Sequence, residues 1–192
     1  MRSRTVLLSA ATALLVAAPT VASAAPVCKL VEDPADDAAL NPALGPVLKA
    51  RALDIRSMDV ATGKTTVVVV LRLASTKIAD DPMTMQGVEW HASFTLAGET
   101  VRFSRKITNA GAVTDTAKAG ETALSGVKVT VTGDSITWTT PRSSLRKLKK
   151  KATLSGFFAD TTTNGAFDLA PNTGYGSTRT YTDRAASCVK AK

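Results

Sequence analysis

Residues 88–107 read VEWHASFTLAGETVRFSRKI, and the alternation within this stretch predicts two adjoining β-strands. Apolar side chains occupy every second position of the first half, at Val88, Trp90, Ala92, Phe94 and Leu96. A turn is expected at 97–99, after which the alternation resumes at Val101, Phe103, Arg105 and Ile107. One face of this hairpin should therefore lie on a hydrophobic core, and the other should carry polar side chains.

Further strands are expected on both sides of this hairpin. Residues 65–73 (TTVVVVLRL) are β-branched and almost continuously apolar, which is typical of a central strand that is buried on both faces. A weaker strand at 53–60 precedes it across a turn at 62–64. Other strands are expected at 127–131 and 136–140, which flank the turn Gly133-Asp134, and at 152–159.

Helix signals are scarce. Residues 141–151 begin with a proline and space two leucines three apart, which fits one or two helical turns at a sheet edge. Residues 109–125 and 161–177 are rich in small and polar side chains, and we expect them to be loops. The chain is therefore expected to be all-β: a single antiparallel β-sandwich, jelly-roll or immunoglobulin-like, with at most one short helix.

The first 24 residues have the features of an export signal. Two arginines precede an apolar stretch at 5–18, and Ala22-Ser23-Ala24 supplies the small residues that a signal peptidase requires. We expect cleavage between Ala24 and Ala25, which leaves 25–192 as one domain in a secreted or extracytoplasmic location. Because the apolar stretch is shorter than the roughly 20 residues that cross a bilayer, we expect no membrane span after cleavage. An uncleaved anchor is the alternative.

The chain contains two cysteines, Cys28 and Cys188. In an oxidising compartment an even pair without metal-ligand spacing predicts one disulfide. Closing a loop of this length contributes about 4–5 kcal/mol in the chain-entropy model. A bridge between two molecules is the alternative.

The composition excludes several classes of protein. With 44% hydrophobic and 21% charged residues among 192, the chain is not disordered, collagen-like or a coiled coil. No nucleophile elbow, phosphate-binding loop or interpretable pair of catalytic carboxylates stands out, so we assign no catalytic residue. The single histidine, His91, lies on the polar face of its strand and is expected to be an exposed surface imidazole.

The densest group of basic side chains comprises Arg142, Arg146, Lys147, Lys149, Lys150 and Lys151, in a chain whose formal charge is +8. Such a patch could bind a cell-wall polyanion, an acidic glycan, nucleic acid or an anionic membrane. We do not expect single-stranded nucleic acid, because no aromatic residues are interleaved with the lysines. The simpler interpretation, which we prefer, is a solvated helix face beside a strand edge that lysines protect from aggregation.

An acidic stretch opens the mature chain, with four carboxylates between Glu32 and Asp37. Crowded like charges repel one another, so the cluster is either fully solvated or holds a cation. The spacing does not match the calcium loop of an EF-hand.

Short motifs along most of the mature chain resemble a group of small secreted bacterial proteins with a β-sandwich similar to family 9 carbohydrate-binding modules and DOMON-like domains. The motifs are Cys28, Asp33-Pro34-Ala35-Asp36, Leu53-Asp54-Ile55, Gly133-Asp134-Ser135-Ile136, Pro141 to Leu145, Asp168-Leu169-Ala170-Pro171, Tyr181 and Ser187-Cys188.

The resemblance implies a structural calcium site. It involves Asp33 and Asp36, with Asp37 as an adjacent ligand and Asp54 as a weaker addition. One departure is Ala35, which stands where the familiar motif has glycine. Carbohydrate modules of this kind also clamp sugar between exposed aromatics, whereas Trp90 and Trp138 alternate in register with apolar residues. We prefer to place both tryptophans in the core, with a sugar platform as the alternative.

These observations favour an exported, non-enzymatic binding or interaction module with an unassigned ligand. Calcium is the one candidate cofactor, and a cell-wall or extracellular glycan is the candidate partner. Two alternatives stay open: a basic protein that adheres to the cell envelope, and a secreted hydrolase.

Overall fold

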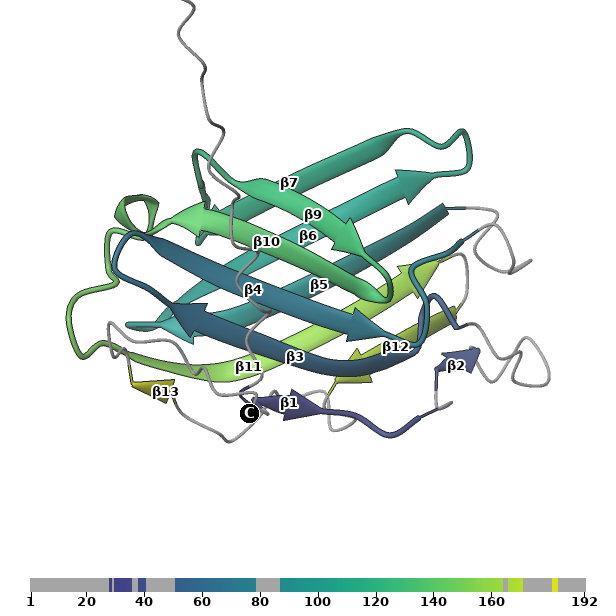
Figure 1. Ribbon diagram of the computed structural model, residues 1–192, viewed down its shortest axis with the longest axis horizontal. Coiled ribbons are helices and arrows are strands. Elements are labelled where there is room, and N and C mark those ends of the chain that lie inside the picture. The colour runs from purple at the N-terminus through teal and green to yellow at the C-terminus, as the bar shows by residue number, and fades with distance from the viewer. Residues whose placement is uncertain are drawn as a thin grey trace, which may run out of the picture.

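The computed structural model describes residues 28, 30–35, 38–40, 51–78, 87–163, 166–170 and 181–182. In these residues two β-sheets lie face to face (Figure 1), and every pairing between described strands is antiparallel. The expected all-β sandwich is therefore confirmed.

The first sheet has five strands, with the apolar stretch TVVVVLRL in its middle. In spatial order the strands are β1 (Val31–Glu32), β3 (Ile55–Thr62), β4 (Thr66–Leu73), β10 (Ser135–Pro141) and β9 (Lys128–Thr132). Alternate residues of β4 point into the sandwich, and Val67, Val69 and Leu71 are fully buried.

The second sheet is built around the hairpin at 87–108. Its path runs β2 (Ala39–Leu40), β12 (Ala166–Ala170), β11 (Thr153–Thr163), β5 (Gly87–Leu96), β6 (Glu99–Thr108), β7 (Val113–Ala119) and β8 (Thr122–Ala123). A further short strand, β13 (Tyr181–Thr182), also pairs with β11.

The core between the sheets contains both tryptophans, as expected. Trp90 is 1% exposed and Trp138 is fully buried. The ring of Trp138 lies 6.2 Å from that of Phe103, so an aromatic contact joins the two sheets across the core.

Buried polar contacts also tie the sheets together at 52–55, where the chain enters β3. The Trp90 indole donates to the carbonyl of Ala52 at 2.7 Å, and the Thr161 hydroxyl donates to that of Leu53 at 2.6 Å. The carboxylate of Asp168 accepts a 2.7 Å hydrogen bond from the Ile55 amide. The motif at 53–55 and Asp168 therefore meet in space, because these side chains satisfy backbone groups that would otherwise be buried without partners.

Two expected loops are wrong in part. Residues 113–119 form β7, and 122–123 form β8. β11 extends to Thr163, and β12 follows at 166–170. Most side chains of β7 and β8 are exposed, so these strands at the sheet margin lack the apolar pattern by which a buried strand is recognised.

The expected helix at 141–151 is reduced to one 3-10 turn at Arg142–Ser144, followed by irregular turns. Leu145 and Leu148 are nevertheless buried, as the spacing of the leucines suggested. Short turns suffice here because the segment needs to place only these two side chains in the core before β11 begins.

Candidate functional site

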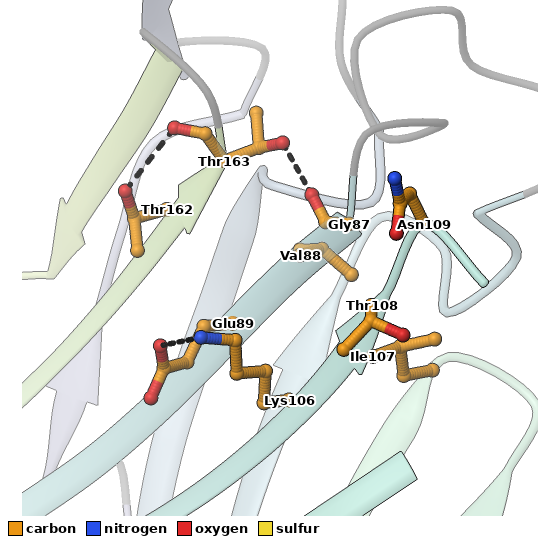
Figure 2. Close-up of a pocket in the computed structure, with 9 residues that line it drawn as sticks. All are labelled: Gly87, Val88, Glu89, Lys106, Ile107, Thr108, Asn109, Thr162 and Thr163. Atoms are coloured by element: carbon orange, nitrogen blue, oxygen red, sulfur yellow. Dashed lines mark hydrogen bonds and ion pairs between the residues drawn. The ribbon is translucent and has the colours of Figure 1, made fainter. Parts of the chain in front are cut away.

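A cavity of about 430 Å³ lies where β5 begins beside the ends of β6 and β11. Figure 2 shows its lining, which mixes a charged pair, an amide and several hydroxyls with two aliphatic side chains; the residues are Gly87, Val88, Glu89, Lys106, Ile107, Thr108, Asn109, Thr162 and Thr163. This volume falls within the range of about 300–1,000 Å³ that is typical of small-molecule sites.

Gly87 shapes the cavity through its backbone. Its φ of +100° belongs to a region that other residues rarely adopt. A Cβ atom at this position would stand 2.8 Å from the carbonyl oxygen of Ile107. The Gly87 carbonyl in turn accepts a hydrogen bond from the Thr163 hydroxyl, so this glycine holds β5, β6 and β11 close together.

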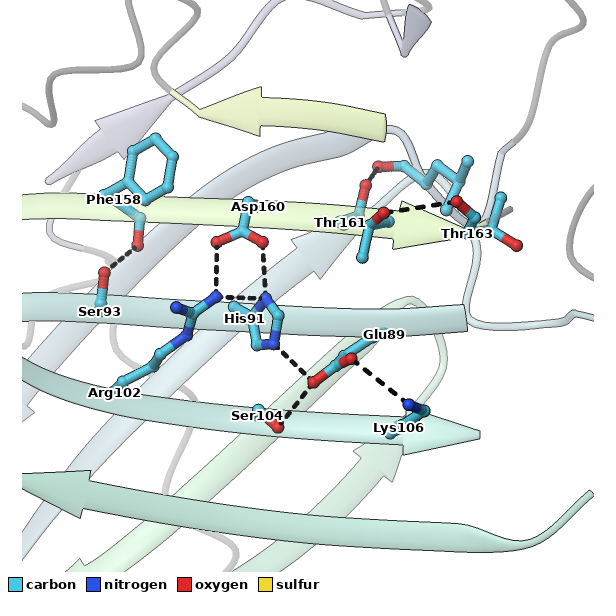
Figure 3. A network of polar contacts seen from close by, with 12 residues as sticks. Glu89, His91, Ser93, Arg102, Ser104, Lys106, Phe158, Asp160, Thr161 and Thr163 are labelled. Carbon is cyan, nitrogen blue, oxygen red and sulfur yellow. Dashed lines mark hydrogen bonds and ion pairs between the residues drawn. The ribbon is translucent and has the colours of Figure 1, made fainter. Parts of the chain in front are cut away.

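The wall of the cavity continues into a network of polar side chains on the outer face of the second sheet (Figure 3). The His91 Nε2 atom lies 2.7 Å from a Glu89 carboxylate oxygen, and Nδ1 lies 2.6 Å from an oxygen of Asp160. At the cavity, the Lys106 ammonium stands 3.9 Å from the other Glu89 oxygen. Three strands therefore position one row of charges that ends in the cavity.

Arg102 closes the far side of this network. Its guanidinium lies 2.7 Å from His91 Nδ1 and 3.4 Å from the second carboxylate oxygen of Asp160. An imidazole donates to two carboxylates only when both nitrogens carry protons, whereas in the neutral ring Nδ1 can accept from Arg102 instead. The network has hydrogen-bond partners for the ring in either form.

The expectation that His91 is an exposed surface imidazole is wrong. The residue is 9% exposed, although it lies on the outer face of its strand as the alternation predicted. The neighbouring side chains of Glu89, Arg102 and Asp160 contact the ring from β5, β6 and β11. Polar side chains on adjacent strands are close enough to cover one another.

No hydroxyl is aligned with the imidazole among the contacts of the described residues. The Ser104 hydroxyl lies 3.5 Å from Glu89 and 3.2 Å from the Thr116 hydroxyl, and Ser93 donates to the Phe158 carbonyl. This arrangement fixes side chains in place and does not place a nucleophile beside a base.

The structure places only part of the expected calcium site, because Asp36 and Asp37 lie outside the described residues. The Asp33 amide donates to the carbonyl of Arg56 at 3.2 Å. The carboxylate of Asp54 is buried and lies 2.8 Å from the Arg56 guanidinium. Since arginine already neutralises this carboxylate, Asp54 fits a cation site poorly.

No group of three or more His, Cys, Asp or Glu side chains is arranged for a metal among the residues that the structure describes. None of the helical turns in that part of the chain has the length or apolar character needed to cross a membrane.

Cys28 is anchored beside Asp59, a buried residue that the sequence did not single out. The Cys28 amide donates to Asp59 Oδ1 at 2.8 Å, and Arg72 contacts the other carboxylate oxygen of Asp59 at 2.5 Å. No described cysteine is free. Cys188 and the predicted cleavage site Ala24-Ala25 lie outside the described residues, so the disulfide pairing and the cleavage remain predictions.

The basic residues of 142–151 lie at the opposite end of the sandwich from the cavity. Lys147 pairs with Glu99, at the start of β6, over 3.2 Å. The cavity, by contrast, is lined by the far end of the same strand. The molecule thus presents two separate polar regions.

Comparison with known proteins finds no matching family model, no matching curated protein and no matching solved structure.

Proposed function

We propose that this protein is an exported, non-enzymatic β-sandwich module that binds a hydroxyl-rich ligand, such as the end of a glycan, in the cavity at 87–89, 106–109 and 162–163. The observation that carries the proposal is the lining itself. Threonine hydroxyls, an asparagine amide and the Glu89–Lys106 pair offer donors and acceptors together. A sugar hydroxyl both donates and accepts, so such a lining suits it.

The network behind the cavity supports the same proposal. Glu89 is held from one side by His91 and from the other by Lys106. Side chains that are already fixed lose less conformational entropy when a ligand arrives. The row of charges would therefore orient the cavity wall for binding. Because both tryptophans lie in the core, recognition would rely on hydrogen bonds and not on an aromatic clamp.

Binding of the full chain to an oligosaccharide array tests this function. Asn109→Ala and Lys106→Met should each weaken binding about tenfold, because each removes a polar group from the lining. Lys77→Gln is a control that removes one charge from a residue outside the lining. Equal binding by all the variants would place the ligand elsewhere. A hydrolytic activity that His91→Ala abolishes would instead support a hydrolase.

The proposal includes a structural calcium ion held by Asp33, Asp36 and Asp37. The support is the density of carboxylates in a basic chain, together with the resemblance to calcium-containing modules. Calcium should raise the melting temperature and EDTA should lower it. The variant Asp33→Asn/Asp36→Asn should be destabilised only when calcium is present. An equal loss in chelator would remove the metal from the proposal.

Export and the Cys28–Cys188 disulfide belong to the same proposal. The arginine-rich start, the apolar stretch and Ala22-x-Ala24 support cleavage before Ala25. The absence of a free thiol at Cys28 supports the disulfide. The mass of the secreted protein, measured with and without reductant, tests both features and separates an intramolecular bridge from one between molecules.

A further inference from the structure

Three segments that are distant in the sequence meet at one end of the sandwich. The Arg142 amide donates to the Thr65 carbonyl at 2.8 Å, and its guanidinium donates to Gly63 at 3.2 Å. Residue 142 thus touches the β3–β4 turn, which contains Lys64. β9 begins at the same end, because Lys128 pairs with Thr139 near the end of β10. Figure 1 shows this turn and the β10–β11 connection side by side at the left.

We call this surface the cationic end. Its positively charged residues are Lys64, Lys128, Arg142, Arg146, Lys147, Lys149, Lys150 and Lys151. The fold therefore adds two lysines, from positions far away in the chain, to the basic run that the sequence shows.

Few of these charges are neutralised. Arg142 uses its guanidinium on the carbonyls of Gly63 and Leu148, and Lys147 pairs with Glu99. The other six are exposed and form no ion pair with any residue in the described ranges; they are Lys64, Lys128, Arg146, Lys149, Lys150 and Lys151. Among the described residues, Glu121 in the β7–β8 turn is another acidic residue near this end.

The segment that carries most of the charge is anchored in the core. Leu145 and Leu148 are buried, and backbone hydrogen bonds link 142 to 145, 145 to 148 and 149 to 152. The Ser144 hydroxyl donates to the Pro141 carbonyl at 2.7 Å. The backbone is thus fixed while the lysines point outward, so less entropy is lost on binding than with a free basic tail.

The chemistry of this surface selects among anionic partners. The two leucines of the run at 142–151 are buried, so this run offers no leucine to insert into a bilayer. The run at 142–151 also contains no aromatic residue on which a nucleobase could stack. Lysine acts as a point charge, which suits repeated phosphate groups in varied geometry more than one rigid bidentate contact.

We propose that the cationic end is a docking surface for a linear polymer that carries repeated phosphate groups. This interaction goes beyond the ligand proposed for the cavity, and the two sites lie at opposite ends of β5 and β6. A variant at either end therefore leaves the other interaction intact, and the two proposals fail independently.

Binding of the full oxidised chain to inorganic polyphosphate tests this surface. The logarithm of the association constant should fall linearly with the logarithm of the salt concentration between about 50 and about 200 mM. The reason is that lysines bound to phosphates displace the counterions condensed on the polymer. Lys149→Gln/Lys150→Gln/Lys151→Gln should lower the affinity at least about tenfold and reduce the slope by about 2–3. Unchanged affinity in this variant would overturn the proposal.

A matched pair of single variants separates position from net charge. Lys64→Gln removes one charge at the cationic end, whereas Lys77→Gln removes one beyond the other end of β4, where Thr76 contacts Gly133. The two ends of this eight-residue strand are about 25 Å apart, well beyond the screening length of about 8 Å. Lys64→Gln should weaken binding and reduce the slope by about 1, while Lys77→Gln should do neither. If both variants weakened binding equally, only net charge would matter, and the proposal that the cationic end is the docking surface would be wrong.

Two other polyanions complete the test. Single-stranded DNA of equal charge should bind no more tightly than polyphosphate, and vesicles of anionic phospholipid should compete only weakly. Tighter binding to DNA, or binding to vesicles without binding to polyphosphate, would contradict the proposal. Unchanged melting temperatures in the glutamine variants would show that the fold is retained.

Discussion

Strand β5 separates two surfaces of opposite chemistry. On its inner face Trp90 and Phe94 are almost fully buried, and the Phe94 ring lies 6.4 Å from Phe103 and 6.2 Å from Phe157. On its outer face Glu89 and His91 make contacts of 2.6–2.7 Å with polar partners from the same and neighbouring strands. Both faces are packed, but the contacts on the outer face are hydrogen bonds and ion pairs, whose strength depends on their direction.

This difference separates stability from positioning. Apolar contacts stabilise in proportion to the area removed from water, and they tolerate changes of shape. Hydrogen bonds and ion pairs add less net stability, but they hold particular atoms in place. We therefore expect substitutions on the inner face to affect unfolding first, and those on the outer face to affect the cavity.

The largest effect is expected from Phe94→Ala. It removes a buried ring that contacts two others, and should cost about 3–5 kcal/mol in the free energy of unfolding. Urea denaturation of the variant and the parent measures the difference. A loss below about 1 kcal/mol would show that the inner face is not packed as described.

A smaller loss, about 1–3 kcal/mol, is expected from His91→Leu. Leucine leaves the carboxylates of Glu89 and Asp160 without the ring between them, although both keep a basic neighbour. Adding Glu89→Gln should restore part of the stability, because it removes one of the two carboxylates. No recovery would mean that the loss comes from packing alone, which would make the outer face resemble the inner one.

Arg105 is a charged residue in the otherwise apolar inner row of β6. It tests whether this part of the inner face depends on an ion pair. Its guanidinium contacts both oxygens of Asp115 in β7, at 3.1 and 2.9 Å. Asp115→Ala should cost about 1 kcal/mol, because it strands a partly buried guanidinium. Arg105→Leu/Asp115→Leu should cost less than the single change, since two apolar side chains replace the pair. A larger loss in the double variant would show that this edge requires the ion pair.

The smallest effect concerns the turn that joins β5 to β6. Ala97 has a φ of +50°, which is unfavourable for alanine, and Gly98 follows with a φ of +78°. Ala97→Asn should raise stability by about 0.5–1 kcal/mol, or about 1–4 °C in the melting temperature, because Asn-Gly suits a two-residue hairpin turn. A lower melting temperature of Ala97→Asn than of the parent would contradict the inference that alanine strains this turn.

Part of the outer network could have been predicted from this turn. A two-residue turn at 97–98 fixes the register of the hairpin and places Glu89 opposite Lys106. Asp160 could not be located in this way, because β11 is far from β5 in the sequence. Its pairing with β5 also shifts register between Ser155 and Phe158. The burial of His91 depends on that distant strand.

The alternation of apolar residues predicted the core side chains and the main hairpins correctly. It failed for β7, whose inner row includes Asp115 and two alanines, because a strand at the sheet margin need not bury much surface. The cationic end was predicted only as the continuous run at 142–151. Lys64 joins it through the pairing of β4 with β10, which local patterns do not reveal. Lys128 joins it through the β9–β10 hairpin.

The order of strands in the first sheet has a consequence for the growing chain. β4 ends at Leu73, while β10, which covers its second edge, begins only at Ser135. Until those later residues have been made, the most apolar strand of the protein has β3 as its main neighbour and an open edge on the other side. Exposed apolar edges of this kind recruit other chains. An unfinished chain is therefore most prone to aggregate between synthesis of β4 and synthesis of β10.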